Sequence, residues 1–520
     1  MGSNIFIIWC LITLFCLCCD AEEVKLLVKG SKSIAKTDED FICATLDWWP
    51  ETKCNYNQCP WGKAGILNLD LKNKILANAI RAFSSLRIRI GGSLQDQVVY
   101  DVVGTSPRKC PHFKRMEGGL FGFSKGCLSK ERWDQINNFF HEMGVRLTFG
   151  LNALVGRRKG GGPDDALMVG EWNLKNSYDL INYTASKGYK IDSYELGNEL
   201  CGSGVSARVE AEQYAKDTVA LKKIVAKFYP NPATRPKVLG PAGFYDKQWF
   251  EAFLDTLGPN VVDGVTHHIY NLGAGVDPTL INKVQDPSFL DQIAETYRDV
   301  AASIERHSPW AGAWVGEAGG AYNSGGRYVS HSFVDGFWYL DQLGMTAKFN
   351  HKVFCRQSLI GGNYGLLNTA TFIPNPDYYG ALLWHRLMGT SVLSTSHTGS
   401  AYLRAYSHCS KKATGIAVLV INMSKYTTFE VMVEDDAKLY ECEQDGDANA
   451  YEREEYHLTP KDGNILSDGL LLNGVALKLT GDSGIPEMEP LVVDASLPMK
   501  IAPRSIVFAL LKGFKATACA

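Results

Sequence analysis

The 520-residue sequence has no surplus of charge of either sign. Lysine and arginine total 53, aspartate and glutamate total 56, and the net charge at pH 7 is −3. Because binding to phosphate backbones requires a basic surplus, this balance argues against a general nucleic-acid-binding protein. Charged residues are 21% of the chain and apolar residues 45%, a composition that excludes a disordered protein and supplies large buried cores.

Long apolar runs are also lacking, apart from one at the N-terminus. Ile5 to Cys19 is almost wholly apolar and is followed by Asp20, Ala21 and two glutamates. This run is too short to span a bilayer and is typical of a signal peptide, so residues 1–21 are predicted to be removed. A buried N-terminal helix is the alternative. We therefore expect no integral membrane segment, and delivery to the cell exterior, the cell wall or a vacuole- or lysosome-like compartment.

Cysteine is sparse for this length, with 14 residues, of which four lie in the predicted signal peptide. The others are too few for a disulfide-built domain, and their spacing matches no zinc site, so no metal is expected. Cys110 and Cys127 flank a polar loop that they could bridge, and Cys409 with Cys519 could tie the chain end to a strand. Acceptor sequences for N-glycosylation begin at Asn182 and Asn422.

Between residues 41 and 357, short apolar runs alternate with segments of helical periodicity. Repeated strand and helix predict a parallel sheet, and eight repeats favour a closed (β/α)8 barrel over residues 41–388, with an open doubly wound sheet as the alternative. The predicted strands are residues 41–46, 86–90, 146–151, 193–196, 238–240, 264–268, 313–316 and 353–356. The predicted helices are residues 71–83, 129–143, 178–187, 209–228, 247–257, 289–307 and 333–343.

The pattern changes to short or alternating apolar runs in residues 389–520. This pattern predicts a C-terminal β-sandwich domain with strands at residues 403–407, 414–422, 427–433, 470–479 and 505–511. An N-terminal strand within residues 22–40 could pair with this domain. Residues 434–447 are acidic and are expected to form a solvated loop.

Two glutamates follow predicted barrel strands, where barrel enzymes carry their chemistry. Glu199 comes after the fourth strand and Glu317 after the seventh, so both should face one cleft mouth. Paired carboxylates are what glycosidic cleavage needs, one as proton donor and one ionised, although a single glutamate at a strand end is usually a solvated loop residue. Asn198 could bind a sugar 2-hydroxyl, and Glu195 is expected deeper in the barrel with a structural role.

Longer motifs around these glutamates resemble the heparanase family of glycoside hydrolases, glycoside hydrolase family 79, and most closely its plant members, which include glucuronidases acting on flavonoid glucuronides. The likeness covers residues about 24 to 519. The motifs are YELGNE at 194–199, VGE at 315–317, LRIRIGGS at 86–93, FGLNAL at 149–154, THHIY at 266–270, and RQ at 356–357 followed by GNY at 362–364.

The resemblance implies a retaining mechanism without a cofactor, with Glu199 as proton donor and Glu317 as nucleophile. It also implies glucuronic acid as the sugar, whose carboxylate would be held after the eighth strand by backbone N–H groups and the tyrosine hydroxyl of Gly362, Asn363 and Tyr364. Further family positions that line the sugar subsite are Asp47, Ser93, His267 and Tyr322.

The segment between the second and third strands is short, so a single chain without an excised linker is expected. Arg157 and Arg158, with Lys159, follow the third strand and could contact an anionic aglycone, although such a run is usually a solvated loop. Three tryptophans could stack on sugar or flavonoid rings or pack the barrel base: Trp48, Trp49 and Trp61.

Three functions remain compatible with the sequence. The first is a secreted β-glucuronidase that releases glucuronic acid from small-molecule glucuronides, such as those of flavonoids, or from glycan termini, such as those of arabinogalactan. The second is an endo-β-glucuronidase that cuts inside an acidic polysaccharide. The third is a non-catalytic carbohydrate-binding protein of the same fold, against which the two intact glutamates argue. The sequence does not predict an oligomeric state.

Overall fold

The computed structural model describes residues 21–103, 110–161, 165–435 and 452–520. Its central feature is a closed barrel in the order β10-β11-β13-β15-β2-β3-β6-β9. Because β15 pairs with β2 and closes the ring, the predicted barrel is confirmed and the open sheet is excluded. All predicted barrel strands are present: β2 (Ile42–Asp47), β3 (Arg87–Gly91), β6 (Arg146–Leu151), β9 (Ser193–Leu196), β10 (Lys237–Phe244), β11 (Gly264–Ile269), β13 (Gly312–Ala318) and β15 (His351–Arg356).

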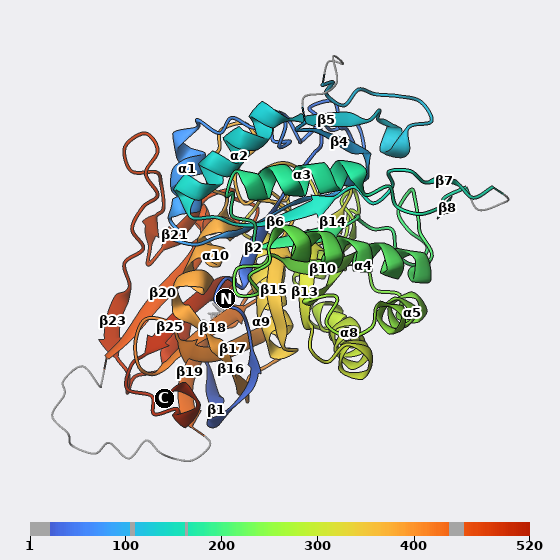
Figure 1. Cartoon of the computed structure of the whole chain (residues 1–520). Coiled ribbons are helices and arrows are strands. Elements are labelled where there is room, and N and C mark those ends of the chain that lie inside the picture. The colour runs from blue at the N-terminus through green and yellow to red at the C-terminus, as the bar shows by residue number, and fades with distance from the viewer. Residues whose placement is uncertain (1–20, 104–109, 162–164, 436–451) are drawn as a thin grey trace, which may run out of the picture.

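Helices cover the outside of the barrel, as Figure 1 shows for α2 to α5 and α8. Local signals fix their ends: α2 begins after Ser129, whose hydroxyl accepts the Arg132 N–H, and it stops at the left-handed Gly144. Every predicted helical segment contains helix, although residues 289–307 divide between two helices. The helices are α1 (Lys74–Arg81), α2 (Lys130–Met143), α3 (Lys175–Ser186), α4 (Ala211–Phe228), α5 (Lys247–Leu257), α6 (Leu280–Val284), α7 (Pro287–Asp291), α8 (Ile293–His307), α9 (Asp335–Lys348) and α10 (Pro376–Leu387).

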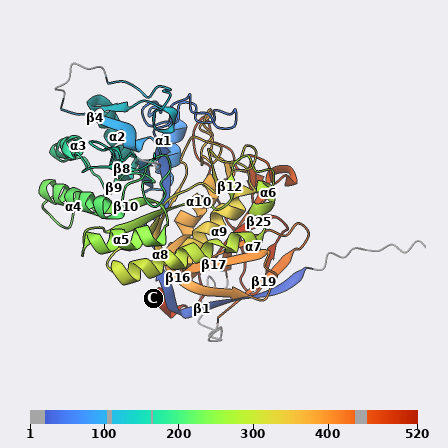
Figure 2. The same cartoon turned by 90° about the vertical axis from the view of Figure 1, so that its right-hand side faces the viewer.

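Helix α9 differs from the others because it is buried on nearly every side, from Asp335 to Ala347. It contacts β15 of the barrel, and it also contacts β1, β16 and β17 of the second sheet. Figure 2 shows α9 between the two parts of the molecule. Unlike an amphipathic helix, which buries only one side, α9 is therefore enclosed by the rest of the protein.

The second part is one mixed sheet in the order β22-β21-β20-β25-β18-β17-β16-β1-β19-β24, with β23 beside β20. The N-terminal strand β1 runs antiparallel to β16 and parallel to β19, as the predicted pairing requires. Side chains of β19 and β24, at one end of this order, share one core with those of β18 and β25 further along it, so the sheet curls around this core like a sandwich. The strands are β1 (Glu22–Lys36), β16 (Met388–His397), β17 (Leu403–Ser410), β18 (Ile416–Asn422), β19 (Phe429–Asp435), β20 (Glu452–Pro460), β21 (Leu470–Leu472), β22 (Val475–Ala476), β23 (Leu491–Asp494), β24 (Met499–Ile501) and β25 (Ser505–Leu511).

The continuous strand predicted at residues 470–479 is wrong. Asn473 and Gly474 both have positive φ angles and form a turn between β21 and β22. The sequence pattern also missed β16, β20, β23 and β24. The predicted signal peptide, residues 1–21, and the acidic loop, residues 434–447, lie almost wholly outside the described residues.

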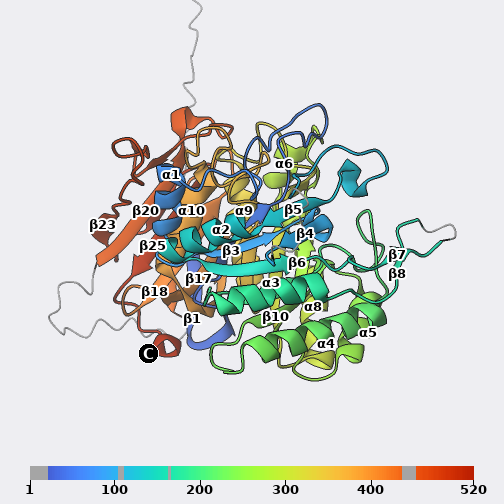
Figure 3. The ribbon, with the colours of Figure 1, turned by 45° about the horizontal axis from the view of Figure 1, so that its top comes forward.

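In the described part of the chain, three small two-stranded sheets lie in the loops of the barrel. They pair β4 (Val98–Asp101) with β5 (Gly126–Ser129), β7 (Arg158–Lys159) with β8 (Met168–Val169), and β12 (Gly273–Ala274) with β14 (Ala321–Tyr322). Figure 3 shows that β7 and β8 project away from the body of the molecule.

Both predicted disulfides are present, Cys110–Cys127 and Cys409–Cys519. Two more were not predicted. Cys43 and Cys355 are 312 residues apart in the sequence but sit on the neighbouring strands β2 and β15, which meet only where the barrel closes. Cys54 and Cys59 close a short loop after β2. Ring closure explains why sequence spacing could not reveal the Cys43–Cys355 pair.

The two predicted glycosylation sites differ in accessibility. Asn182 is exposed on α3. Asn422 is fully buried, and its amide donates to the carbonyls of Thr427, Ile501 and Ala502. Because those bonds use the nitrogen that would carry the glycan, the prediction for Asn422 is wrong in the folded protein. Within the described part of the chain, no helix has the length and apolar character needed to cross a membrane.

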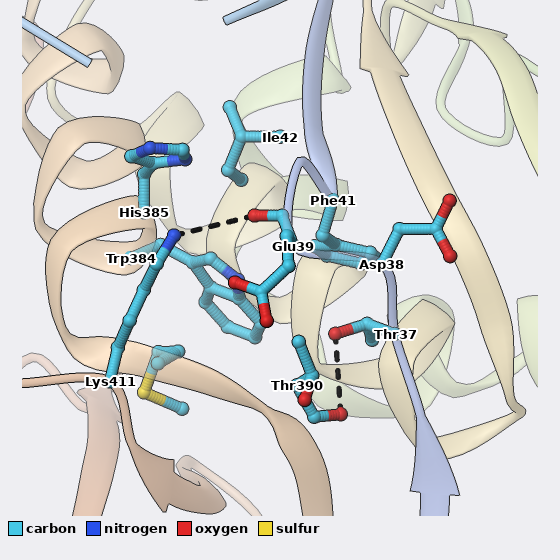
Figure 4. A pocket seen from close by; sticks show the side chains of 10 residues that line it. Thr37, Asp38, Glu39, Phe41, Ile42, Trp384, His385, Thr390 and Lys411 are labelled. Carbon is cyan, nitrogen blue, oxygen red and sulfur yellow. Dashed lines mark hydrogen bonds between the residues drawn. The ribbon is translucent and has the colours of Figure 1, made fainter. Parts of the chain in front are cut away.

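At the base of the barrel, the connection from β1 to β2 lines a small cleft (Figure 4). The Lys411 ammonium donates to the Glu39 carbonyl at 3.3 Å, and the Thr37 hydroxyl donates to the Thr390 carbonyl at 3.4 Å. These bonds join the connection between β1 and β2 to β16 and to the residue after β17, at the end of the barrel opposite the carboxyl ends of its strands.

Candidate active site

A cavity of about 500 Å³ opens at the carboxyl ends of the barrel strands. Because the strands are parallel, residues at their ends meet there although they are far apart in sequence. The cavity is lined by Asp47, Trp49, Lys53, Asn55, Ser93, Phe121, Glu199, Val205, Phe244, Tyr270, Glu317, Tyr322, Asn323, Ser324, Gln357 and Tyr364.

The two predicted catalytic glutamates are neighbours in this cavity. One oxygen of Glu199, one oxygen of Glu317 and one nitrogen of His268 lie within 4.8 Å of one another. His268 Nδ1 lies 3.0 Å from Glu199 Oε1. Burial raises the pKa of Glu199 to about 7, although the nearby Arg89 charge opposes the rise. A carboxyl group with this pKa is about half protonated at pH 7 and mostly protonated in weak acid, as a general acid must be.

Glu317 is held differently, by donors on both oxygens. The Tyr270 hydroxyl donates to Oε1 at 2.6 Å, and Arg89 Nη1 donates to Oε2 at 2.9 Å. Arg89 supplies a positive charge beside this carboxylate, and together the two donors fix its orientation. The pair therefore contains one carboxyl group suited to give a proton and one oriented carboxylate.

Arg89 organises the floor of the cavity from β3. Its Nε donates to Glu195 at 2.6 Å and its Nη2 donates to the Asn198 side-chain oxygen at 3.0 Å. Glu195 is fully buried in this ion pair, in agreement with the structural role expected for it. Arg89 was not predicted, although the alternation of Arg87 and Arg89 with isoleucines in β3 places both arginines on one face.

The backbone after β9 turns sharply to present Glu199. Gly197 and Glu199 have φ angles of +67° and +53°, and a Cβ on Gly197 would lie 2.9 Å from Leu200 and Tyr214. The Asn198 N–H donates to Asp96 at 2.8 Å and the Glu199 N–H donates to the Ala242 carbonyl at 2.7 Å. Hydrogen bonds to Asp96 and to β10 thus hold a non-glycine residue in a left-handed conformation.

Several predicted subsite residues do line the cavity, namely Asp47, Ser93, Tyr322 and Tyr364. Burial and the neighbouring Glu317 charge raise the pKa of Asp47, while Gln357 donates to its Oδ2 at 3.0 Å. Asn198, which was expected to contact a sugar hydroxyl, is buried and is not among the residues that line the cavity, and its Nδ2 has no hydrogen-bond partner among the described residues.

The prediction for His267 is wrong. Its side chain is fully buried, and its Nε2 lies 2.9 Å from His351 Nε2, on the outside of the barrel wall. Successive side chains of a strand point to opposite faces, so His268 turns inward to Glu199 while His267 turns to the helices. The same alternation in β11 could have identified His268 from the sequence.

Asn363 has no backbone donor left for the predicted carboxylate contact. The Asn363 N–H donates to the Ser324 carbonyl at 2.7 Å, and its side chain donates to the Gly325 carbonyl at 3.1 Å. Neither Gly362 nor Asn363 lines the cavity, whereas Tyr364 does. The segment therefore braces the loop that carries Ser324.

The arginines predicted on the aglycone side lie outside the cavity. The Arg157 side chain is completely buried, forms an ion pair with Asp217 and donates to the Ala153 carbonyl at 2.9 Å. Arg158 is exposed in the projecting β7–β8 pair. Trp49 lines the cavity, and the other two tryptophans, Trp48 and Trp61, are buried and pack within the core.

A closed barrel with an acidic pair at the carboxyl ends of its strands is typical of glycoside hydrolases. The family model "Glycosyl hydrolase family 79, N-terminal domain" matches residues 23–344. Heparanase-like protein 2 of Arabidopsis thaliana is 52% identical, with 96% of this chain and 95% of that protein covered. Baicalin-beta-D-glucuronidase of Scutellaria baicalensis is 42% identical over 95% of this chain and 93% of that protein. The chain belongs to glycoside hydrolase family 79.

Solved structures confirm the architecture. The crystal structure of a 4-O-alpha-L-rhamnosyl-beta-D-glucuronidase from Fusarium oxysporum superposes with a TM-score of 0.66 at 13% identity. It covers 94% of this chain and 100% of that one. At this identity the likeness concerns the fold alone, and the assignment of roles depends on the cavity.

Proposed function

We propose that the protein is a retaining β-glucuronidase that removes β-linked glucuronic acid from small-molecule glucuronides or glycan termini. The observation that carries the mechanism is the separation of the two carboxylates, which have oxygens within 4.8 Å of each other. Retaining enzymes hold their carboxyl groups about 5–5.5 Å apart, whereas inverting enzymes leave room for a water. The glucuronide specificity rests on the family and on the baicalin-cleaving relative.

In the first step a Glu317 oxygen attacks the anomeric carbon and Glu199 transfers its proton to the departing glycosidic oxygen. The bond to the aglycone breaks as the glycosyl–Glu317 ester forms. In the second step Glu199, now ionised, takes a proton from water, and the resulting hydroxide oxygen replaces Glu317 on the sugar. Arg89 and Tyr270 keep the attacking carboxylate in place, while His268 orients Glu199.

The two roles can be separated by hydrolysis of aryl glucuronides. Glu317→Gln should abolish turnover of every substrate, because no covalent intermediate forms. Glu199→Ala should retain the first step for a good leaving group such as 4-nitrophenol, and added azide should then release glucuronyl azide. Glu171→Gln, on an exposed residue, is the matched control. Unchanged turnover by Glu317→Gln, or absence of azide rescue in Glu199→Ala, would overturn these roles.

Exo action is the function we favour, and endo action inside an acidic polysaccharide is the competing one. Digestion of a polymer with terminal and internal glucuronic acid separates them. Exo action releases free glucuronic acid from the start, whereas endo action shortens the polymer before the monosaccharide accumulates. A fall in polymer length without early release of glucuronic acid would contradict the exo assignment.

A secretory destination, outside the cell or in a vacuole-like compartment, is also part of the proposal. The four disulfides support it, because disulfides persist in oxidising compartments. The protein purified from its own cells should begin near residue 22 and carry a glycan at the exposed Asn182 and none at Asn422. Mass spectrometry that finds an uncleaved N-terminus and no glycan at Asn182 would argue against secretion.

A further inference from the structure

An exposed aromatic ring lies in the cavity beside the proton donor. Phe244 is the last residue of β10, lines the cavity and is 41% exposed. Its ring centre lies 6.4 Å from that of His268 and 6.1 Å from that of Tyr270. His268 is hydrogen-bonded to Glu199, and Tyr270 donates to Glu317. Phe244 therefore contacts a partner of each catalytic carboxyl group, although the two-step mechanism gives it no part.

A β-bulge in β10 turns Phe244 toward the cavity. β10 pairs in parallel with β11, but the register shifts between Pro241 and Gly243, and Ala242 is not paired with a residue of β11. Ala242 has a φ angle of +56°. The extra residue moves the alternation by one place, so that Phe244 pairs with the inward-facing His268. In a regular strand, Gly243 would take that place and Phe244 would turn toward the helices.

The same bulge holds the backbone of the proton donor. The Glu199 N–H donates to the Ala242 carbonyl at 2.7 Å. Gly243 packs so closely here that a Cβ on it would lie 3.1 Å from the Glu199 Cα. Bulges next to active sites re-aim side chains, and this one fixes the positions of Glu199 and Phe244 relative to each other.

Val205 is a second apolar side chain beside the proton donor. It lines the cavity, half-buried, and its N–H donates to the Glu199 carbonyl at 3.0 Å. The lining near Glu317 is polar by comparison, with the Tyr270 hydroxyl on one carboxylate oxygen and Asp47 within range of the Glu317 charge. Neither Val205 nor the neighbouring aromatic ring offers a hydrogen bond to a group that lies beyond Glu199.

We infer that Phe244 is the stacking surface for the aglycone and that the aglycone it selects is a planar aromatic ring. This inference rests on the proposed function, since it names the leaving group of that reaction. The proton donor must reach the glycosidic oxygen, so the aglycone lies on the Glu199 side of the cavity, where Phe244 is. Pairs of aromatic rings gain energy beyond that of apolar burial. A sugar in this place would find no hydrogen-bond partner on the Phe244 or Val205 side chain, so aryl glucuronides should be preferred to glycan termini.

The test compares 4-methylumbelliferyl β-D-glucuronide with trifluoroethyl β-D-glucuronide, whose aglycone is small and not aromatic. Each substrate is compared between the wild type and the variant, so the difference in leaving-group acidity cancels. Phe244→Ala should lower kcat/KM for the aryl substrate by about 5- to 100-fold, the range for removing an aromatic side chain stacked on a planar base. The trifluoroethyl substrate makes little contact with the ring and should change by less than about threefold.

Three further variants separate stacking from packing. Phe244→Trp should keep the preference for the aryl substrate, because it keeps an aromatic face. Phe244→Leu keeps apolar bulk without that face and should recover only part of the loss, and it carries the test if Phe244→Ala does not fold. Tyr426→Ala removes a ring that is 73% exposed outside the cavity and is the matched control, to which neither substrate should respond.

Inhibition by free D-glucuronate gives an independent readout, because this ligand has no aglycone. Its inhibition constant should be the same in the wild type and in Phe244→Ala. A raised inhibition constant, or equal losses for the two substrates, would overturn the inference and make Phe244 a sugar contact or a support of Glu199. An unchanged kcat/KM for the aryl substrate would also overturn it. A wild-type protein that cleaves neither glucuronide would instead refute the proposed function itself, and the inference with it.

Discussion

Two buried arginines, Arg89 and Arg356, each bind a pair of carboxylates, but only one of these clusters faces a cavity. Arg89 contacts Glu195 and Glu317 at the mouth of the barrel. Arg356 contacts Asp335 at 2.7 Å and Asp377 at 3.0 Å, among β15, α9 and α10. Neither arginine is more than 1% exposed.

The difference lies in what the carboxylates can reach. Glu317 lines the cavity and has Glu199 beside it. Asp335 and Asp377 are closed in by the helices, and Trp338 and Tyr339 pack against the Arg356 guanidinium. Buried charge alone therefore does not mark a catalytic centre, because the same motif of one arginine and two acids also fastens α9 and α10 to the barrel.

The largest effect is expected for Arg89→Met in the cavity cluster. Loss of one oxyanion-hole donor costs about 10²–10³-fold in rate. Arg89 supports the nucleophile, Glu195 and Asn198 together, so its loss should cost at least as much. We expect kcat/KM for an aryl glucuronide to fall by about 10³-fold or more. Kinetics on protein whose folding is checked by circular dichroism would measure it. Full activity in Arg89→Met would contradict the view that the Arg89 cluster is catalytic and the Arg356 cluster only structural.

The next effect concerns Arg356→Met, which should act on stability. Removing one partner of a buried ion pair costs about 3–5 kcal/mol, because the remaining carboxylates are left uncompensated. Urea unfolding should show a loss of this size, while kcat of the folded fraction stays within about threefold. Arg306→Met, which breaks an exposed pair with Glu251, is the control and should change stability by less than about 1 kcal/mol. A large loss of kcat in Arg356→Met would contradict the structural role.

A smaller effect should appear in the pH dependence, through Glu199. Catalysis needs this group protonated, so kcat/KM should fall as pH rises through about 7, the pKa that burial gives it. The folded-state pKa is raised above the ordinary 4.5, so the folded protein should lose about 3 kcal/mol between pH 4.5 and 7 from this group. Glu199→Gln should flatten that part of the stability profile measured by urea unfolding. An activity profile that is flat from pH 5 to about 9 would contradict the assignment.

The sequence predicted the barrel well because its signals are local. Each barrel strand is a short apolar run, and strand alternation with helices required no knowledge of distant contacts. β20 was missed because its buried positions include Arg453 and Glu455, which pair with each other at 2.6 Å and have further partners, the Leu497 carbonyl for Arg453 and His457 for Glu455. An apolar pattern cannot reveal a strand whose buried residues are charged.

For the active site, the sequence predicted the two glutamates but missed several of the residues around them. Glu199 and Glu317 could be found because each follows a strand, and strand ends converge in a barrel. Tyr270 and Gln357 also directly follow barrel strands, but an uncharged side chain at a strand end gave no chemical reason to single it out. Lys53 lines the cavity only because of how the loop after β2 crosses the mouth. The error at His267 came from choosing a motif position over strand alternation, which favours His268.

The most direct test of the account is to identify the residue that becomes covalently attached to the sugar. A 2-deoxy-2-fluoro-β-D-glucuronyl fluoride slows the second step of a retaining enzyme and leaves the sugar on the nucleophile. Proteolysis and tandem mass spectrometry should then place the label on Glu317. A label on Glu199 or Glu195, or hydrolysis without any covalent adduct, would contradict the assignment of the cavity cluster as the catalytic one.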